Sequence, residues 1–445
     1  MEKEERLNET IKKVANEFLE ITANREILVV SHFDTDGITS AAILTKALKR
    51  LDRKFYVKII KNLTREFIYQ LPKDKVILFL DLASGSLNHL ANSNLENIFI
   101  IDHHELIQEI PEKVRIINPE LTTKEKISTS GLSYLFCREL DPENKNSAKL
   151  AILGMIGDTL EKEIDKLNHE ILNEGEIKIR RGALIYPSTR PLNRALEYSS
   201  TPFIPGVTGD VRGVLELLRE AGLNPTNQGY PTLLELNAEE MEKLVTAILL
   251  RTPKTKNNEI VGDIYLIKLY GKLEDARELS ARINACSRLG SSDLALQLCL
   301  EVSSAKKKAE SLHVKYRQHI VSALKYVSEN PAIEGKGYKI INAKANIKDT
   351  IIGTIASIIS NSKIHEDGTI IITLAYSEEK KIKISARNVG TTGRNVRELL
   401  ARVVENLGGE VGGHEFAAGC LINQEHEEIF LENLKKSLDL EVIRI

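Results

Sequence analysis

The sequence predicts an α/β protein whose N-terminal part is a parallel, doubly wound sheet. Short β-rich runs alternate with helical patterns through the first half of the chain, and these runs are Ile27–Val30, Phe55–Ile60, Val76–Leu80, Ile98–Ile101 and Val114–Ile117. Such alternation is typical of parallel strands joined by crossover helices. Apolar residues then recur at helical spacing from Ile38 to Leu51, so the polar segment before them is a loop between a strand and a helix. Two more helices are expected near Gly131–Leu140 and Ser147–Ile156.

The rest of the chain predicts three further parts. Pro, Gly, Ser and Thr are frequent from about Tyr186 to Gln228, which favours a loop-like stretch that leads into a shorter helical region. A charged helical pattern runs from about Asp275 to Ser328, and the end of the chain returns to strands and helices at Tyr338–Asn342, Ile351–Ile359, Thr369–Leu374, Lys381–Ala386 and Arg394–Leu407. We therefore expect a sheet domain at 1–185, an insertion or connecting subdomain at 186–272, a helical connector at 273–332 and a smaller α/β domain at 333–445.

Composition excludes several classes of protein. The 445 residues carry 61 Lys and Arg against 63 Asp and Glu, a net charge of -2, and no apolar run approaches the roughly 18 residues that a membrane helix needs. The start of the chain is a charged amphipathic helix without a signal-peptide pattern, so we expect a cytoplasmic protein with no membrane partner. The four cysteines form no CxxC pair, which argues against disulfides and a zinc ribbon and favours small buried side chains.

Acidic and histidine side chains follow three of the predicted strands. They are His32, Asp34 and Asp36 in SHFDTDG, Asp81 in FLDLASG, and Asp102, His103 and His104 in IIDHHE; Asp158 ends the helical segment GMIGDT. In an open parallel sheet the carboxyl ends of the strands line one crevice, so these side chains should converge. Neighbouring carboxylates repel one another, and bound cations would resolve that conflict. Imidazole with carboxylate suits Mn²⁺ and related ions, and a shared carboxylate permits two ions about 3.5–4 Å apart. Hydrolysis of a phosphate ester or anhydride is the natural reaction.

A simpler interpretation is that each acidic residue is a helix N-cap or turn former, which is the usual role of a single Asp after a strand. Isolated caps do not explain three histidines at strand ends as well. Asp102 has a second interpretation of its own, because it could orient His103 rather than bind an ion directly.

A glycine-rich motif, GGEVGGHEFAAGC, lies near the end of the chain. Gly412 and Gly413 would allow close approach of a backbone, and His414 could meet an anion or a base. Ser385 and Arg387 end a predicted strand, and the planar fork of Arg387 suits a phosphate. The alternatives are a glycine turn before a buried Ala-rich segment and a solvated arginine.

Taken together, these motifs resemble the DHH phosphoesterase superfamily with its C-terminal DHHA1 domain. Five motifs stand in the family's order, with the triplet Asp102-His103-His104 in third place, and they span Ser31 to Gly419. The segment RINACSRLGSSDLALQL is similar to the connector of RecJ-like single-strand nucleases. The chain leaves no room for the oligonucleotide-binding domain of bacterial RecJ, so it is most similar to archaeal RecJ-like nucleases, which associate with GINS or Hef.

The resemblance implies an active site in the cleft between the two α/β domains, with two divalent ions, Mn²⁺ or else Mg²⁺. One ion would be held by His32, Asp34 and Asp81, and the other by Asp36, Asp81, His103 and Asp158. Catalytic roles would fall to Asp102 and His104. Substrate contacts would come from Ser385, Arg387, Gly412, Gly413 and His414.

The resemblance further implies a single-strand DNA or RNA exonuclease that releases nucleoside monophosphates, in replication or repair. A track for the strand is predicted from basic residues at Lys178, Arg180, Arg181, Arg190, Arg194, Arg277, Arg282 and Arg288, although charge runs are usually solvated faces. Two alternatives stay open: a phosphodiesterase for nanoRNA, cyclic dinucleotides or phosphoadenosine phosphate, and a replication-fork scaffold with little catalysis.

Overall fold

The computed structural model of the chain describes residues 2–442, apart from 107, 123–124, 163, 200–201, 254, 363, 378–379 and 391. The chain packs as two compact units. Unit 1 is formed by Met1–Arg180 and Ile264–His313, and unit 2 by Arg181–Asp263 and Val314–Ile445.

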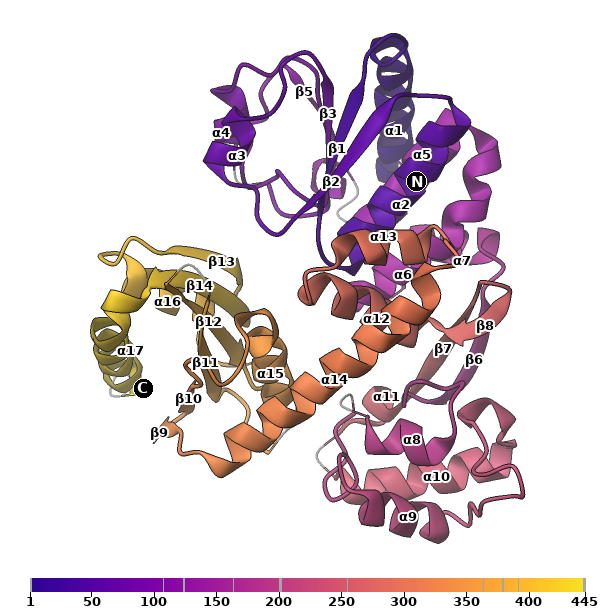
Figure 1. Cartoon of the computed structure of the whole chain (residues 1–445), viewed down its shortest axis with the longest axis vertical. Coiled ribbons are helices and arrows are strands. Elements are labelled where there is room, and N and C mark those ends of the chain that lie inside the picture. Colours follow the sequence, from indigo (N-terminus) through magenta and orange to yellow (C-terminus); the bar gives the residue numbers. More distant parts are fainter. Residues whose placement is uncertain are drawn as a thin grey trace. The chain divides into compact units, whose positions relative to one another are not determined.

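Unit 1 is built on a five-stranded parallel sheet with the order β2-β1-β3-β4-β5 (Figure 1). The strands are β1 (Ile27–His32), β2 (Phe55–Ile60), β3 (Val76–Leu80), β4 (Ile98–Ile101) and β5 (Val114–Ile117). The predicted parallel sheet is confirmed, and the last four strands have the predicted bounds.

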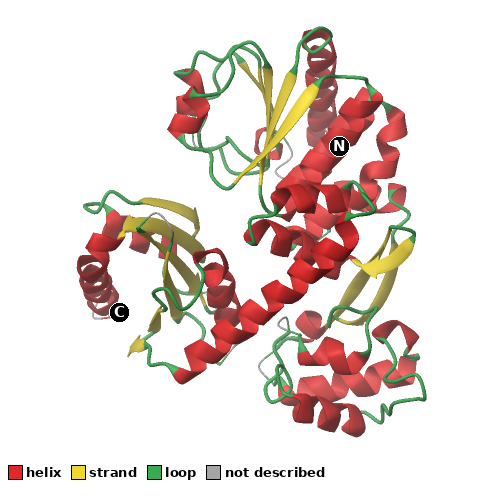
Figure 2. Cartoon of the chain, in the orientation of Figure 1, coloured by secondary structure: helices red, strands yellow, loops and turns green. Residues whose placement is uncertain are grey.

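Helices cover both faces of this sheet, and each face has its own apolar core (Figure 2). The core on one face includes residues of α1 (Glu2–Ile21), α2 (Thr35–Arg50), α5 (Thr129–Leu140), α6 (Ala148–Gly157) and α7 (Lys166–Glu174). The other packs against the short helices α3 (Arg65–Tyr69) and α4 (Leu87–Ala91). Every residue of β3 and β4 is therefore buried, which explains why these strands are continuous apolar runs in the sequence.

The helical pattern predicted at Asp275–Ser328 is three helices, not one. These are α12 (Ala276–Arg288), α13 (Ser292–Cys299) and α14 (Ala305–Glu329). The breaks contain Gly290 and Glu301, both with a positive φ that ends a helix. A three-stranded sheet with the order β6-β7-β8 precedes them, made of β6 (Lys178–Ala183), β7 (Val261–Leu269) and β8 (Lys272–Asp275).

The stretch Tyr186–Gln228, predicted as loop-like, contains two helices in the structure. They are α8 (Leu192–Glu197) and α9 (Val211–Glu220), and α10 (Ala238–Arg251) and α11 (Asn257–Ile260) follow. The side chain of Asp210 caps α9 by accepting a hydrogen bond from the backbone of Arg212, and α9 buries Val214, Leu217 and Leu218. An apolar stripe at helical spacing outweighs the turn-forming composition here.

A six-stranded sheet organises the rest of unit 2, with the order β13-β14-β12-β11-β10-β9. Its strands are β9 (Ile333–Gly335), β10 (Tyr338–Asn342), β11 (Ile370–Tyr376), β12 (Lys381–Asn388), β13 (Glu410–His414) and β14 (Ala417–Asn423). The helix α15 (Asp349–Asn361) joins the parallel pair β10 and β11. One face carries a core with α16 (Val396–Val404) and α17 (Glu427–Val442). The glycine-rich motif, for which a turn was one interpretation, forms the β13–β14 hairpin.

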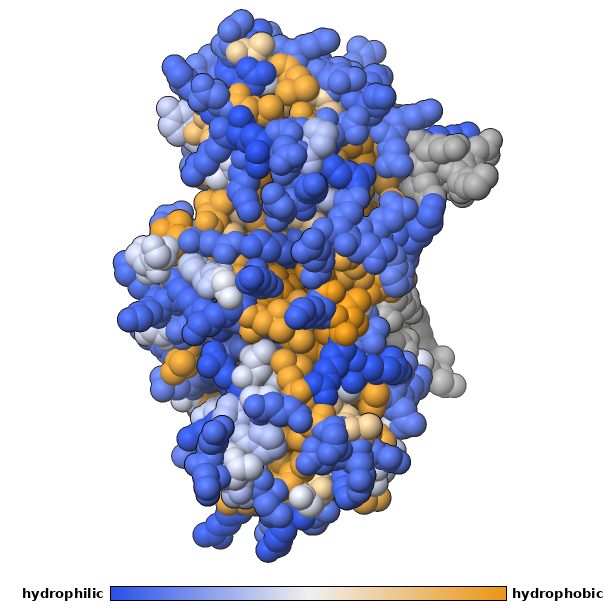
Figure 3. Space-filling view, turned by 90° about the vertical axis from the view of Figure 1, so that its right-hand side faces the viewer, coloured by the Kyte–Doolittle hydropathy of each residue, from blue (hydrophilic) through white to orange (hydrophobic). Residues whose placement is uncertain are grey.

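The buried cysteines agree with the prediction from composition. No helix among the described residues is long and apolar enough to cross a membrane. On the face drawn in Figure 3, hydrophilic residues surround smaller hydrophobic patches. All four cysteines, Cys137, Cys286, Cys299 and Cys420, are buried with free thiols.

Candidate metal centre

The eight acidic and histidine residues that follow the strands and α6 come together at the carboxyl ends of β1, β3 and β4. Asp81 lies at the centre of this cluster and is 3% exposed. Its Oδ2 lies 3.2 Å from Nδ1 of His32, while its Oδ1 lies 3.6 Å from Nε2 of His103 and 3.8 Å from Nδ1 of His104. Asp34 and Asp158 extend the cluster, at 3.0 Å from His32 and 3.6 Å from His103.

Backbone strain accompanies this arrangement. Asp81, Ala83 and Thr159 all have positive φ values, of 58°, 85° and 58°. Non-glycine residues rarely adopt this left-handed conformation, which costs of order 1–3 kcal/mol each. The turns after β3 and α6 therefore keep a costly geometry beside the carboxylates.

Asp36 is fully buried and is held by the N-terminus of α5. Its Oδ2 accepts a hydrogen bond from the backbone N–H of Thr129 at 2.7 Å, and its Oδ1 accepts one from that of Ser130 at 2.9 Å. A helix N-terminus stabilises an anion through its unpaired N–H groups and its dipole. Sequence reasoning missed Thr129 and Ser130, although Ser128 before them is a good N-cap residue.

Asp102 holds the ring of His104. Its Oδ1 lies 2.7 Å from Nδ1 of His104 and accepts the backbone N–H of His103 at 2.9 Å, while its Oδ2 accepts the N–H of Ser84 at 3.0 Å. The hypothesis that Asp102 orients His103 is therefore modified, because Asp102 contacts the backbone of His103 but the ring of His104. Asn118 supports the same turn by donating to the carbonyl of His104 at 2.9 Å.

Burial and crowding of like charges shift the pKa values of the carboxylates. Burial raises the pKa of Asp81 and of Asp158 well above the usual range, and the neighbouring carboxylates raise both further. Burial also opposes ionisation of Asp34, but the charge of His32 and a hydrogen bond to it bring the pKa of Asp34 below its ordinary value. Without a cation, the cluster therefore disfavours simultaneous ionisation of all its carboxyl groups.

The donor set fits divalent cations. Three groups of residues each offer ligand atoms that lie within 4.8 Å of one another: His32, Asp34 and Asp81; Asp36, His103 and Asp158; and Asp81, His103 and His104. Oδ2 of Asp158 is buried and accepts no hydrogen bond from the described part of the chain. A cation would satisfy this oxygen and neutralise the carboxylates, and mixed imidazole and carboxylate ligands suit Mn²⁺.

The predicted phosphate contacts come together separately, on one face of the sheet in unit 2. Strand register aligns Arg387 with Ala417 and His414, and Ser385 with Gly419 and Gly412. Gly413 has a φ of +117°, and a Cβ there would lie 2.3 Å from the carbonyl oxygen of Ala417, so only glycine fits. The Arg387 guanidinium donates to Ser357 and to the carbonyls of Ala386 and Ala418. The register thus places Arg387 and His414 next to small residues of the neighbouring strands.

The predicted substrate contact Arg282 has a different setting. It is 1% exposed and its guanidinium pairs with Glu274 at 3.0 Å and with Glu278 at 3.4 Å. A buried ion pair with two carboxylates favours a structural role, so we leave Arg282 out of the substrate contacts proposed below. Arg288 ends the same helix, α12, and is half-buried.

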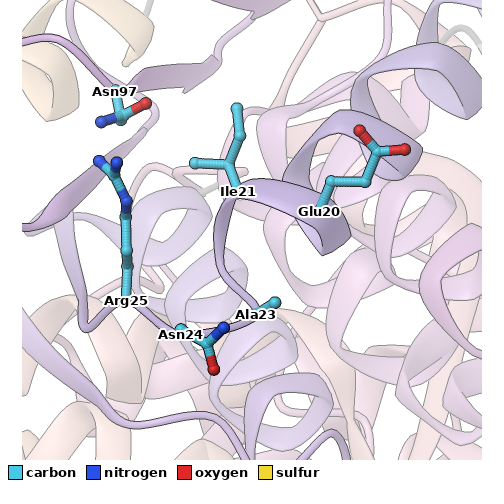
Figure 4. Close-up of a pocket in the computed structure, with 6 residues that line it drawn as sticks. All are labelled: Glu20, Ile21, Ala23, Asn24, Arg25 and Asn97. Carbon is cyan, nitrogen blue, oxygen red and sulfur yellow. The ribbon is translucent and has the colours of Figure 1, made fainter.

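A small hollow at the other edge of the sheet contains none of the candidate residues. It is lined by Glu20, Ile21, Ala23, Asn24, Arg25 and Asn97, with Arg25 and Asn97 pointing toward one another (Figure 4). Arg25 and Asn97 precede β1 and β4, so the hollow lies at the amino ends of these strands. The chemistry-bearing side chains gather at the opposite, carboxyl edge.

Comparison with known proteins matches three family models to this chain. The N-terminal domain of the DHH family matches residues 26–157, the DHH-CID domain matches 185–260 and the DHHA1 domain matches 336–439. The chain therefore belongs to the DHH/DHHA1 superfamily. An uncharacterized protein of Methanocaldococcus jannaschii is 28% identical over 432 residues, which cover 92% of each chain.

Solved structures show the same fold. RecJ of Thermus thermophilus in complex with Mn²⁺ has a TM-score of 0.61 at 19% identity, and the match covers 97% of this chain but only 54% of that RecJ chain. CDC45 of Entamoeba histolytica has a TM-score of 0.66 at 11% identity, over 97% of this chain and 99% of that one. The protein thus has the DHH-family phosphoesterase fold that RecJ and CDC45 share.

Proposed function

We propose that this protein is a metal-dependent exonuclease that hydrolyses single-stranded DNA or RNA from an end and releases nucleoside monophosphates. The observation that carries the proposal is the position of Asp81, whose two oxygens face His32 on one side and His103 on the other. A carboxylate in that position can bridge two divalent ions, as in two-metal sites that catalyse phosphoryl transfer. Mn²⁺ is the expected ion, with Mg²⁺ as the substitute.

The proposed ligands divide between the two oxygens of Asp81. His32, Asp34 and Asp81 would hold one ion, and Asp36, Asp81, His103 and Asp158 the other. Ions bound there would make a water molecule acidic and offset the charge of the phosphate under attack. His104, held by Asp102, would donate to a non-bridging phosphate oxygen, because its own hydrogen bond to the Asp102 carboxylate raises the pKa of His104 and favours its charged form.

Unit 2 would supply the contacts to the substrate. We assign these contacts to Ser385, Arg387 and His414, with Gly412 and Gly413 giving access to the backbone. The guanidinium of Arg387 and the nearby small residues suit a phosphate of the strand. We propose that a track of basic residues contacts the nucleic-acid strand beyond the active site. These residues are Arg288 and the exposed Lys178, Arg181, Arg190 and Arg194. The division into four domains, and a replication or repair partner of the GINS or Hef type, belong to the same proposal.

The test is digestion of end-labelled DNA and RNA strands with Mn²⁺ and then Mg²⁺, with the products separated by length. We expect mononucleotide release from long strands. Asp36→Ala and His103→Ala should abolish this activity while leaving the circular dichroism spectrum unchanged. Glu105→Gln is the matched control, because Glu105 is an exposed acid beside the motif and outside the cluster. Full turnover by either cluster variant would overturn the two-ion assignment.

The same digestion separates the two alternatives. A strong preference for di- to tetranucleotides over long strands would favour a phosphodiesterase for short substrates. A replication-fork scaffold is favoured by the likeness to CDC45 over nearly the whole chain, and it predicts no metal-dependent cleavage of any strand. The six candidate ligands that stand together here argue for catalysis.

A further inference from the structure

Thr129 connects two carboxylates of the candidate metal centre that come from different parts of the sheet. Thr129 is the first residue of α5 and is fully buried. Its backbone N–H donates to Oδ2 of Asp36 at 2.7 Å, and its Oγ1 donates to Oδ1 of Asp81 at 3.2 Å. Asp36 follows β1 and Asp81 follows β3, so one residue fixes both carboxylates relative to α5.

These contacts fall on one side of the cluster. Oδ1 of Asp81, which accepts the Thr129 hydroxyl, is the oxygen that faces His103, whereas Oδ2 faces His32. Within the described part of the chain, no hydrogen bond joins Thr129 to His32 or Asp34. A hydroxyl has one proton to donate, and its donation to Oδ1 leaves the remaining lone pairs of that oxygen available for a cation.

We propose that Thr129 is a positioning residue for one of the two ions only, the ion expected between Asp36, Asp81, His103 and Asp158. The proposal rests on the two-ion site described above. The hydroxyl of Thr129 donates to Oδ1 of Asp81, and this hydrogen bond fixes the direction of that oxygen relative to α5. Groups that orient metal ligands in this way typically account for a 10- to 100-fold change in metal affinity.

The test removes the hydroxyl and keeps the backbone N–H. Metal-free full-length protein carrying Thr129→Val is titrated with Mn²⁺ by calorimetry, and electron paramagnetic resonance distinguishes coupled ion pairs from single ions. We expect binding of one ion to weaken by about 10- to 100-fold while the other is unchanged. Thr129→Ser should restore wild-type binding. Thr129→Ala repeats the loss without added bulk, should the valine variant fail to fold.

Ser133→Ala is the matched control. Ser133 lies on the same helix, and its buried hydroxyl has no hydrogen-bond partner in the described chain, so both ions should bind as in the wild type. Three results would overturn the proposal. The affinity for both ions could fall equally, it could stay unchanged in Thr129→Val and Thr129→Ala, or Thr129→Ser could fail to restore it. No nucleic acid is present in these titrations. If Thr129→Val selectively loses one ion but the wild-type protein shows no nuclease activity, only the proposed function is overturned and the role of Thr129 stands.

Discussion

Both carboxylate oxygens of Asp102 accept hydrogen bonds from groups of the protein. Asp102 is 1% exposed and accepts hydrogen bonds from Ser84, His103 and His104. Burial opposes its ionisation, but the hydrogen bond and charge of His104 outweigh this effect and lower the pKa of Asp102 to about 2. A permanent negative charge therefore faces Nδ1 of His104, and the other ring nitrogen is left for a ligand.

Replacing Asp102 by asparagine should lower the pKa of His104. The carboxylate stabilises the imidazolium, so the wild-type His104 keeps its positive charge to a higher pH than an ordinary histidine. The neutral amide removes this stabilisation, and His104 should lose its charge earlier as the pH rises. Nuclear magnetic resonance of labelled histidine rings measures the midpoint, and His104→Gln assigns the signal. An unchanged midpoint in Asp102→Asn would contradict the assignment.

At the scale of secondary-structure elements, the packing of α6 against the start of α5 determines the position of the Asp36 side chain. A Cβ added at Gly154 of α6 would lie 1.9 Å from Oγ of Ser130 and 2.4 Å from Oδ1 of Asp36. Only glycine lets the two helices approach closely enough for α5 to direct its amides at the carboxylate. The position of a candidate ligand thus depends on the contact between two helices.

Gly154→Ala should damage both the fold and the metal centre. The added methyl group must displace Ser130 or Asp36, and overpacking of this kind costs roughly 1–3 kcal/mol of unfolding free energy. Chemical denaturation and Mn²⁺ titration should show lower stability and weaker binding. In the control Gly85→Ala the added Cβ meets nothing within 4 Å, so both properties should stay near wild type. Wild-type Mn²⁺ affinity in Gly154→Ala would show that this packing does not place Asp36.

Elements were predictable from the sequence where a β-rich run lies between turn signals, both on the buried strands β3 and β4 and on the partly exposed strand β2. The strands β2 to β5 have the predicted bounds because apolar runs with turn signals at both ends define them locally. The β13–β14 hairpin was missed because glycine disfavours strands in isolation, and its pairing with β12 is non-local. The helix α5 was predicted to begin at Gly131 but begins at Thr129, so the residues whose amides bind Asp36 lay outside the predicted helix.

At the scale of the whole molecule, the candidate chemistry divides between the two units. All eight residues of the metal cluster belong to unit 1, whereas Ser385, Arg387 and His414 belong to unit 2. Motif order in the sequence predicted which residues lie together in each of the two groups. It could not predict the orientation of single side chains, such as the contact of Asp102 with His104, because that depends on the turn that Ser84 and Asn118 stabilise.

Mn²⁺ should stabilise unit 1 selectively. A ligand that binds only the folded state at 100 times its dissociation constant adds about 2.7 kcal/mol to the unfolding free energy. Pulse proteolysis, with the fragments identified by mass spectrometry, should show protection of 26–157 and little change at 336–439. Asp36→Ala should remove the protection. Equal protection of both units would contradict the placement of the ions in unit 1.

The burial of β3 and β4 on both faces has a consequence for how the cluster comes apart. The candidate ligands Asp81 and His103 follow strands that carry no solvent-facing side. Backbone amides in such strands exchange their hydrogens with water only when a whole cooperative unit opens. The candidate metal centre therefore lies beside the strands whose amides should exchange most slowly in unit 1. Its candidate ligands should separate only when the sheet unfolds.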